Sequence, residues 1–229
     1  MEDYKDWLNS LTETESILPE DIPDIGLYMD QVTTLMDTKL AESKRYPEDK
    51  IMTKTMVNNY TKNHLLPPSE KKKYSREHVL LLIMIYYLKN ILSISDIQNL
   101  LAPLSEKYFP KNRENGLTLE AIYQKVLQDN TKKHPSLTEE ILSTWKESRN
   151  SFSSYPLSEE EKEYLDDFSF IYQLSYDIYL RKQIIEQLID RRRKEHASEH
   201  SSAEKKKNQK KAYCGSYSLP SGRDVPQAR

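Results

Sequence analysis

Two adjacent asparagines and a run of three lysines are the residues of this 229-residue chain best suited to chemistry with a partner. Asn58 and Asn59 carry amides that donate and accept hydrogen bonds together, which matches the edge of adenine in the major groove of DNA. Lys71, Lys72 and Lys73 supply cations suited to backbone phosphates. The chemistry indicated is nucleic-acid binding, with base contacts from the amides and phosphate contacts from the lysines.

Other polar and aromatic residues nearby extend this candidate site. Small hydroxyls and lysines suit phosphate oxygens at the ends of a helix, and a tyrosine suits stacking against sugar or phosphate. The candidate DNA-binding residues are Thr53, Lys54, Thr55, Asn58, Asn59, Tyr60, Lys62, Lys71, Lys72, Lys73, Tyr74 and Arg76. A plainer alternative stays open, in which Asn59 caps or solvates a turn and the lysines keep a loop soluble.

Helices are expected on both sides of this lysine run. Thr53 or Thr55 caps a first helix, and Pro67-Pro68 prevents that helix from continuing past Leu66. Ser75 begins a second helix that extends to about Asn90, with Glu77 as a loose capping-box partner and Val79 to Leu88 as its apolar body. A third, short helix over 96–101 is capped by Ser93 or Ser95 and stopped by Pro103.

This order of elements resembles the winged helix-turn-helix module of MerR-type transcription regulators. The motifs that carry the resemblance are Val57, Tyr60, Leu65-Leu66-Pro67-Pro68, Lys73-Tyr74-Ser75 and Leu92-Ser93-Ile94-Ser95-Asp96-Ile97. The resemblance implies that the first helix reads bases and that the lysine loop is a wing lying along the DNA backbone. Three features depart from the MerR pattern: Asn58 replaces an arginine, His64 replaces a glycine, and the wing is shorter and lacks its glycine.

A longer resemblance, from about Asp21 to Leu188, is to the YkrK-type family of Gram-positive bacterial proteins, a domain of unknown function. Members of that family carry the MerR-like module, and the resemblance implies a transcriptional repressor.

Charge is segregated along the chain, although the formal net charge is only −2. Residues 1–50 hold 5 Lys/Arg and 13 Asp/Glu, whereas residues 51–90 hold 7 and 2. A local basic region in an acidic body is typical of a protein that brings one face to phosphates. With only 4 glycines and 37% hydrophobic residues, the composition favours an all-α fold.

The remainder of the chain is expected to be helical up to its tail. Residues 1–20 form a frayed segment or a short docking helix, and helices are predicted over 25–43, 119–129, 137–149 and 159–195. The long last helix requires a partner, either the helices before it or its copy in a dimer. The predicted domains are an acidic N-terminus (1–20), a DNA-binding domain (21–110), a helical dimerisation or regulatory region (111–195) and a disordered tail (196–229).

Enzymatic and metal chemistry lack the residues they need. One cysteine, Cys214, excludes a multi-cysteine zinc site, and His64 and His78 have no companions at ligand spacing. No nucleophile motif, phosphate loop or dinucleotide fingerprint occurs, so we expect no catalysis and no cofactor. The longest apolar run, Val79 to Leu88, is too short to span a bilayer, and a cytoplasmic location is expected.

We therefore predict an all-α protein with a MerR-like helix-turn-helix module followed by a helical bundle with a long C-terminal helix. Its expected partner is double-stranded DNA, bound by a homodimer that represses by occupying an operator. The alternative is a helical protein-interaction module built on the same scaffold without DNA. Tyrosines in the C-terminal half are explained either by core packing or by an effector pocket, whose ligand is open.

Overall fold

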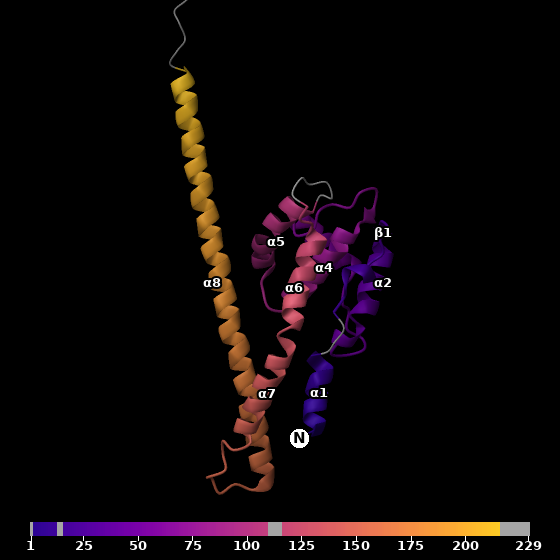
Figure 1. Ribbon diagram of the computed structural model, residues 1–229, viewed down its shortest axis with the longest axis vertical. Coiled ribbons are helices and arrows are strands. Elements are labelled where there is room, and N and C mark those ends of the chain that lie inside the picture. Colours follow the sequence, from indigo (N-terminus) through magenta and orange to yellow (C-terminus); the bar gives the residue numbers. More distant parts are fainter. Residues whose placement is uncertain (1, 13–15, 110–115, 216–229) are drawn as a thin grey trace, which may run out of the picture. The chain divides into compact units, whose positions relative to one another are not determined.

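Helix α4 (Arg76–Leu88) forms the centre of the core in the computed structural model, which describes residues 2–12, 16–109 and 116–215. Every residue from Glu77 to Ile83 is buried, because helices and strands on several sides cover the apolar sequence Val79 to Tyr86. Helix α6 and strand β2 pack against α4, and α2 packs against both strands and α3 (Figure 1).

The described residues are mostly helical, which confirms the all-α prediction. Two short 3-10 helices, η1 (Pro19–Asp21) and η2 (Ala41–Ser43), and a two-stranded sheet complete the structure. The remaining elements are α1 (Glu2–Thr12), β1 (Leu27–Tyr28), α2 (Met29–Lys39), α3 (Lys54–Lys62), β2 (Lys73–Tyr74), α5 (Ile94–Tyr108), α6 (Leu119–Thr131), α7 (His134–Ser148) and α8 (Glu159–Gly215).

The predicted helix over 25–43 is wrong at its start. Residues 27–28 form β1, which pairs antiparallel with β2 through Leu27↔Tyr74 and Tyr28↔Lys73. Helix α2 begins only at Met29, where the Gln31 side chain accepts the backbone amide of Tyr28 at 2.8 Å. A strand this short exists because of its tertiary partner, so no local periodicity reveals it.

The start of α4 is capped by a residue other than the predicted one. Ser75 is the N-cap, as expected, but the reciprocal partner is His78 in place of Glu77. The backbone amide of Ser75 donates to His78 Nδ1 at 3.0 Å, because His78 is the third helical residue and faces back toward the cap.

Helix α5 is longer than predicted. Ser93 caps it, with Oγ accepting the amide of Asp96 at 3.1 Å, but the helix continues through Pro103 to Tyr108. Pro103 is exposed, so the carbonyl that loses its helical hydrogen bond faces solvent, which reduces the cost of a proline inside the helix.

Helices α6 and α7 extend the structure away from α4. Thr118 caps α6 by accepting the amide of Ala121, and α7 begins at His134, before the predicted start at residue 137. Helix α1 lies alongside α7 (Figure 1), where Tyr4 stacks on Trp145 with ring centroids 4.9 Å apart. Of the two interpretations of residues 1–20, the docking helix is therefore the one the structure shows.

The first part of α8 runs antiparallel to α7. Arg149 pairs with Asp167 at 2.8 Å and Arg181 pairs with Glu140 at 3.2 Å, so the two helices form a hairpin. The chain divides into two units, Met1–Glu186 and Gln187–Arg229. In the second unit α8 continues to Gly215, past the predicted end at residue 195, whereas residues 216–229 lie outside the description.

The predicted domain boundary at 110 and 111 also falls outside the described residues. Helix α6, which follows this boundary, packs against α4 and α5, which precede it. Among the described residues, none of the helices combines the length and the apolar character required to cross a lipid bilayer.

Candidate nucleic-acid interface

The exposed face of α3 is polar and carries both asparagines. Residues at spacings of three, four and seven lie on one side of a helix, so four exposed side chains share this face. They are Thr55, Asn58, Asn59 and Lys62. The asparagine amides therefore point outward beside a hydroxyl and an ammonium group, an arrangement that suits the base edges and phosphates of a duplex.

The opposite face of α3 anchors the helix in the core. Val57 is fully buried and Tyr60 is 5% exposed. Burial raises the pKa of the Tyr60 hydroxyl. The Tyr60 ring, one of two candidates for stacking on DNA, is part of the core, where it holds the polar face of α3 in position.

Both ends of α3 are closed by local hydrogen bonds. Thr53 Oγ1 accepts the amide of Met56 at 3.2 Å, which makes Thr53 the N-cap. At the other end, the amides of Leu65 and Leu66 both donate to the carbonyl of Tyr60, at 2.9 and 3.3 Å. His64, directly before Leu65, has a φ of 56°, a left-handed conformation that glycine adopts with less strain.

The three lysines lie on a tight hairpin. Glu70 and Lys73 exchange two backbone hydrogen bonds, of 3.1 and 2.9 Å, around Lys71 and Lys72. The φ angles of Lys71 and Lys72 are 50° and 63°, so the two-residue turn has the geometry of type I′. All three lysine side chains are exposed, which places three ammonium groups within a few residues at the tip.

This hairpin is fixed to the body through its C-terminal strand. Tyr74 is 6% exposed and pairs with Leu27 of β1, which is also buried. A Cβ added at Gly26 would lie 3.1 Å from both Cβ and Cδ of Lys73, so glycine there permits the close approach of the two strands. The side chain of Tyr74, the other candidate for stacking on DNA, is thus a core anchor.

Helix α2 holds both parts of the interface. It packs against α3, β1 and β2, so the polar helix face and the lysine hairpin are positioned by one element. Lys54, at the start of α3, forms an ion pair with Asp30 of α2, and both side chains are largely exposed. An exposed ion pair of this kind contributes little to stability, so the Lys54 ammonium remains available to phosphate.

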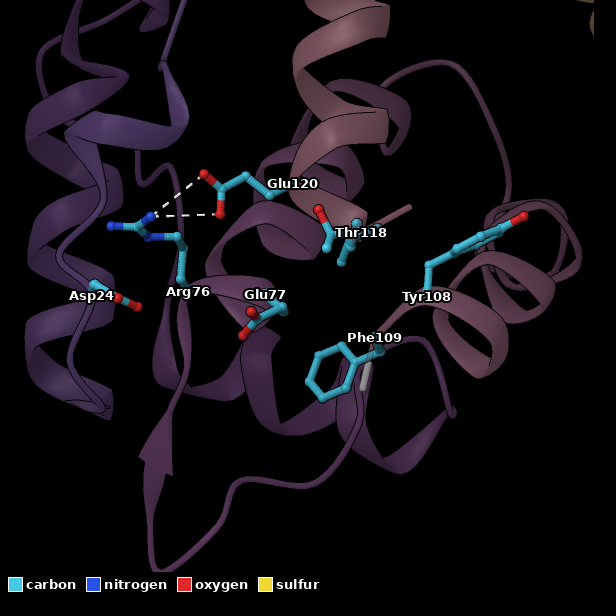
Figure 2. A pocket seen from close by; sticks show the side chains of 8 residues that line it. Asp24, Arg76, Glu77, Tyr108, Phe109, Thr118 and Glu120 are labelled. Carbon is cyan, nitrogen blue, oxygen red and sulfur yellow. Dashed lines mark hydrogen bonds and ion pairs between the residues drawn. The ribbon is translucent and has the colours of Figure 1, made fainter. Parts of the chain in front are cut away.

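Arg76 does not lie with the other basic residues. Its guanidinium Nη1 is 3.5 Å from both carboxylate oxygens of Glu120 on α6, and its side chain is mostly buried. It lines a cavity of about 270 Å³ together with Asp24, Glu77 and Phe109 (Figure 2). The structure thus places Arg76, which was predicted to contact the DNA backbone, beside Glu120 of α6 and apart from the exposed lysines.

Two residues of the interface were missing from the expectation from sequence. Tyr28 of β1 is exposed, and the Lys73 ammonium lies 5.4 Å from its ring centroid, so this tyrosine sits beside the lysine hairpin. Gly26 was overlooked with it. The available signal was the position of Gly26 directly before Leu27-Tyr28, in a chain with only 4 glycines. A glycine next to a short apolar pair indicates a close approach of two backbone segments.

Eight of the twelve candidates are exposed, on α3 and on the hairpin that α2 also contacts: Lys54, Thr55, Asn58, Asn59, Lys62, Lys71, Lys72 and Lys73. Thr53 acts as a cap, Tyr60 and Tyr74 belong to the core, and Arg76 belongs to the cavity. In the described part of the chain, no group of three or more His, Cys, Asp or Glu side chains is placed to hold a metal ion.

Comparison with known proteins places residues 17–126 in a family model described as a domain of unknown function (DUF1836). The matched residues span η1 to α6, and so include α3, the lysine hairpin and the cavity. No curated protein and no solved structure matches the chain.

Proposed function

We propose that this protein is a sequence-specific, double-stranded DNA-binding transcription regulator that represses by occupying an operator. The observation that carries the proposal is the pairing of an exposed amide-bearing helix face with a lysine-tipped hairpin on one supporting helix. The helix offers groups for base edges, and the hairpin offers cations for the flanking phosphates.

The order of elements supports this proposal. The chain runs strand, helix, helix, hairpin and helix (β1, α2, α3, Glu70–Lys73 and α4), and β1 pairs with the second strand of the hairpin. This is the order expected of a winged helix-turn-helix, and it agrees with the MerR-like motifs of the sequence. In that arrangement α3 enters the major groove and the lysine hairpin follows the backbone.

We propose further that the protein acts as a homodimer through α8. Large apolar side chains lie along one face of the first part of α8 at positions 164, 168, 171/172 and 178/179, a pattern of three- and four-residue steps that Ser175 interrupts, and each is 51 to 69% exposed. These residues, here named the α8 stripe, are Tyr164, Phe168, Ile171, Tyr172, Ile178 and Tyr179. The opposite face of α8 packs on α7, so the stripe is not used inside the unit.

Charge favours a second copy of α8 in the antiparallel direction. The first turn holds Glu159, Glu160 and Glu161, whereas Arg181 and Lys182 follow the end of the stripe. An antiparallel pair that places Phe168 opposite Ile178 brings the acidic end of each helix near the basic end of the other. A parallel pair would place the glutamates beside one another, which like charges oppose.

Selection of the purified full chain against random duplexes at physiological salt tests the proposal. We expect enrichment of an inverted repeat, because two modules related by a two-fold axis read two half-sites. Binding to the enriched duplex should weaken steeply with salt, by about 0.9 log unit per log unit of salt for each neutralised phosphate. Absence of both enrichment and salt-sensitive binding would favour the alternative, a protein-interaction module.

Substitutions separate base reading from phosphate binding. The double variant Asn58→Ala/Asn59→Ala should lose discrimination between the enriched and scrambled duplexes by at least about tenfold, since each bidentate amide contributes roughly 1–3 kcal/mol. Lys71→Ala/Lys72→Ala should weaken binding to both duplexes alike and reduce the salt dependence. Asn99→Ala, at an exposed asparagine of α5, is the control and should change neither. Equal loss on both duplexes in the asparagine variant would exclude α3 as the reading helix.

A further inference from the structure

The last part of α8 is basic and has no apolar face. Residues 191–215 contain nine Lys/Arg and three Asp/Glu, and they include no Leu, Ile, Val, Met, Phe or Trp. A helix that is polar on every side has no face to bury against a protein core or against another helix. This part of α8 therefore offers a partner charge, whereas the α8 stripe offers apolar contact.

Four successive cations at the start of this part are exposed on the helix surface. They are Arg191, Arg192, Arg193 and Lys194, here named the α8 basic cluster. Arg191 pairs with Glu195 at 3.0 Å, and Arg193 pairs with Asp190 at 3.1 Å, each within about one turn of the same helix. Exposed ion pairs of this kind contribute at most about 1 kcal/mol, so a phosphate oxygen can replace either carboxylate.

A second group of cations follows along the same helix. Helix α8 is continuous from the cluster to Gly215, and a rise of about 1.5 Å per residue places residue 205 about 21 Å beyond residue 191. Like charges four residues apart on a helix repel each other, and two such pairs occur here. A polyanion that neutralises them would therefore stabilise the helix as it binds. The five cations are Lys205, Lys206, Lys207, Lys210 and Lys211.

From this distribution of charge we propose that the α8 basic cluster binds the phosphate backbone of double-stranded DNA without reading its sequence. A guanidinium group binds two phosphate oxygens at once, and three of the four cations are arginines. A helix that lies in a membrane surface buries an apolar face, which this part of α8 lacks. The choice of duplex DNA among polyanions rests on the proposed function, whereas the affinity of the cluster for phosphate does not.

The cluster adds affinity without adding specificity. Phosphates carry no sequence information, so this contact strengthens binding to every duplex by the same factor. Discrimination between duplexes is left to the amides of α3. The cluster thus holds the chain on DNA while α3 selects the site.

Fluorescence anisotropy with labelled duplexes tests the proposal on the full chain, at several salt concentrations. The probes are the enriched duplex with flanking sequence on both sides and a scrambled duplex of equal length. The variant Arg191→Gln/Arg192→Gln/Arg193→Gln/Lys194→Gln should weaken binding to both at least about tenfold at about 0.1 M salt, with an unchanged ratio of affinities. The salt dependence should decrease by about 0.9 log unit per log unit of salt for each phosphate contact that is lost.

Circular dichroism checks that the variant keeps its helical content, since glutamine is a good helix former. If helix is lost, Arg192→Gln/Lys194→Gln replaces the fourfold variant, because it leaves the ion pairs of Arg191 and Arg193 in place. It should show about half of the change in salt dependence. Unchanged affinity and unchanged salt dependence in the folded variant would overturn the proposal.

The control removes the same amount of positive charge elsewhere. Lys125→Gln/Lys132→Gln/Lys133→Gln/Lys146→Gln alters exposed lysines of α6, α7 and the turn between them, and it should leave both affinities and the salt dependence unchanged. An equal loss in this control would assign the effect to the net charge of the chain and overturn the cluster.

Failure of this proposal is distinguishable from failure of the proposed function. Binding of all duplexes alike, lost in the cluster variant, would support the cluster and refute sequence-specific reading. Selective binding that the cluster variant leaves intact would refute the cluster and preserve the proposed function. Vesicles of phosphatidylglycerol and phosphatidylcholine are the remaining probe. If the cluster retains the chain on these vesicles at salt concentrations where the scrambled duplex is not bound, DNA is the wrong partner and the proposal is overturned.

Discussion

Two regions of this protein use apolar side chains in opposite ways. Around α4, seven successive residues from Glu77 to Ile83 are buried, and Ile83 has no exposed surface. Along the α8 stripe, apolar residues of similar size are more than half exposed, and Ile171 is 63% exposed. Both regions contain isoleucine and tyrosine on helices, so residue type alone does not distinguish them.

The difference lies in what surrounds each helix. Strand β2 and helix α6, from opposite sides in the sequence, pack against α4, whereas the contacts of α8 with α7 and with Tyr4 of α1 leave its stripe exposed. An exposed row of large apolar groups is typical of an interaction surface. The region around α4 is thus a closed core, whereas the α8 stripe is an exposed apolar surface, which we propose a second copy covers.

Matched isoleucine substitutions should show the largest contrast. Ile83→Ala removes buried methyl groups and leaves a cavity, so it should lower the free energy of unfolding by about 2–5 kcal/mol. Ile171→Ala, measured at protein concentrations where the chain is monomeric, should change it by less than about 0.5 kcal/mol. Urea denaturation followed by circular dichroism measures both. Similar costs at the two positions would show that the stripe is part of the monomer's own core.

Charged substitutions on the stripe should separate association from folding. Ile171→Glu with Ile178→Glu places carboxylates in the proposed dimer contact, and we expect the monomer to be the main species in sedimentation at micromolar concentration. The helical circular dichroism should be preserved. Ile184→Glu, an exposed isoleucine off the stripe, is the control and should leave the dimer intact. A wild-type chain that sediments as a monomer would refute the dimer directly.

The sequence revealed the elements that local chemistry determines. Thr53 was one of two predicted caps of α3, because a hydroxyl at the start of a helix is a local signal, and it accepts the amide of Met56. The polar face of α3 was also predictable, since helical spacing turns Asn58 and Asn59 away from Val57.

Features that depend on distant residues were missed. Arg76 was assigned to the DNA face, but Glu120, 44 residues later, turns it inward. Strand β1 forms because Tyr74 pairs with Leu27, across a gap that no local pattern spans. Tyr60 was assigned to stacking although its helical position beside Val57 already indicated burial. Local patterns thus identified the helices, whereas tertiary partners determined which basic and aromatic groups stay accessible.

The core around α4 contains one histidine, His78, whose protonation should destabilise the folded state. Burial lowers the pKa of His78, against the opposing effects of the Pro68 carbonyl and the Glu77 carboxylate. The folded state therefore favours the neutral ring, whose Nδ1 accepts the Ser75 amide. The contribution of the neutral His78 ring to the free energy of unfolding is complete above about pH 6.5, the ordinary histidine pKa. It is lost as the pH falls toward the lowered pKa of the folded state.

The midpoint temperature of thermal unfolding of the wild type should accordingly decrease when the pH is lowered from 7.5 to 5.5. In His78→Gln, which does not titrate, the decrease should be smaller. His134→Gln, at a partly exposed histidine of α7, serves as the control and should retain the wild-type decrease. An equal decrease in wild type and His78→Gln would assign the pH dependence to other groups.

The smallest expected effect concerns His64, the one residue at the end of α3 whose backbone is strained. A φ of 56° is less favourable for a residue with a Cβ than for glycine. The His64 side chain is exposed, so its removal loses little packing. His64→Gly should therefore raise the free energy of unfolding by about 0.5–1 kcal/mol, measured by urea denaturation. Asn63→Gly, one residue earlier at a φ of −92°, should instead destabilise, because no strain is relieved there. If both glycine substitutions destabilise the protein, the left-handed backbone at His64 is not strained, and the end of α3 is as well accommodated by its own residues as the core around α4.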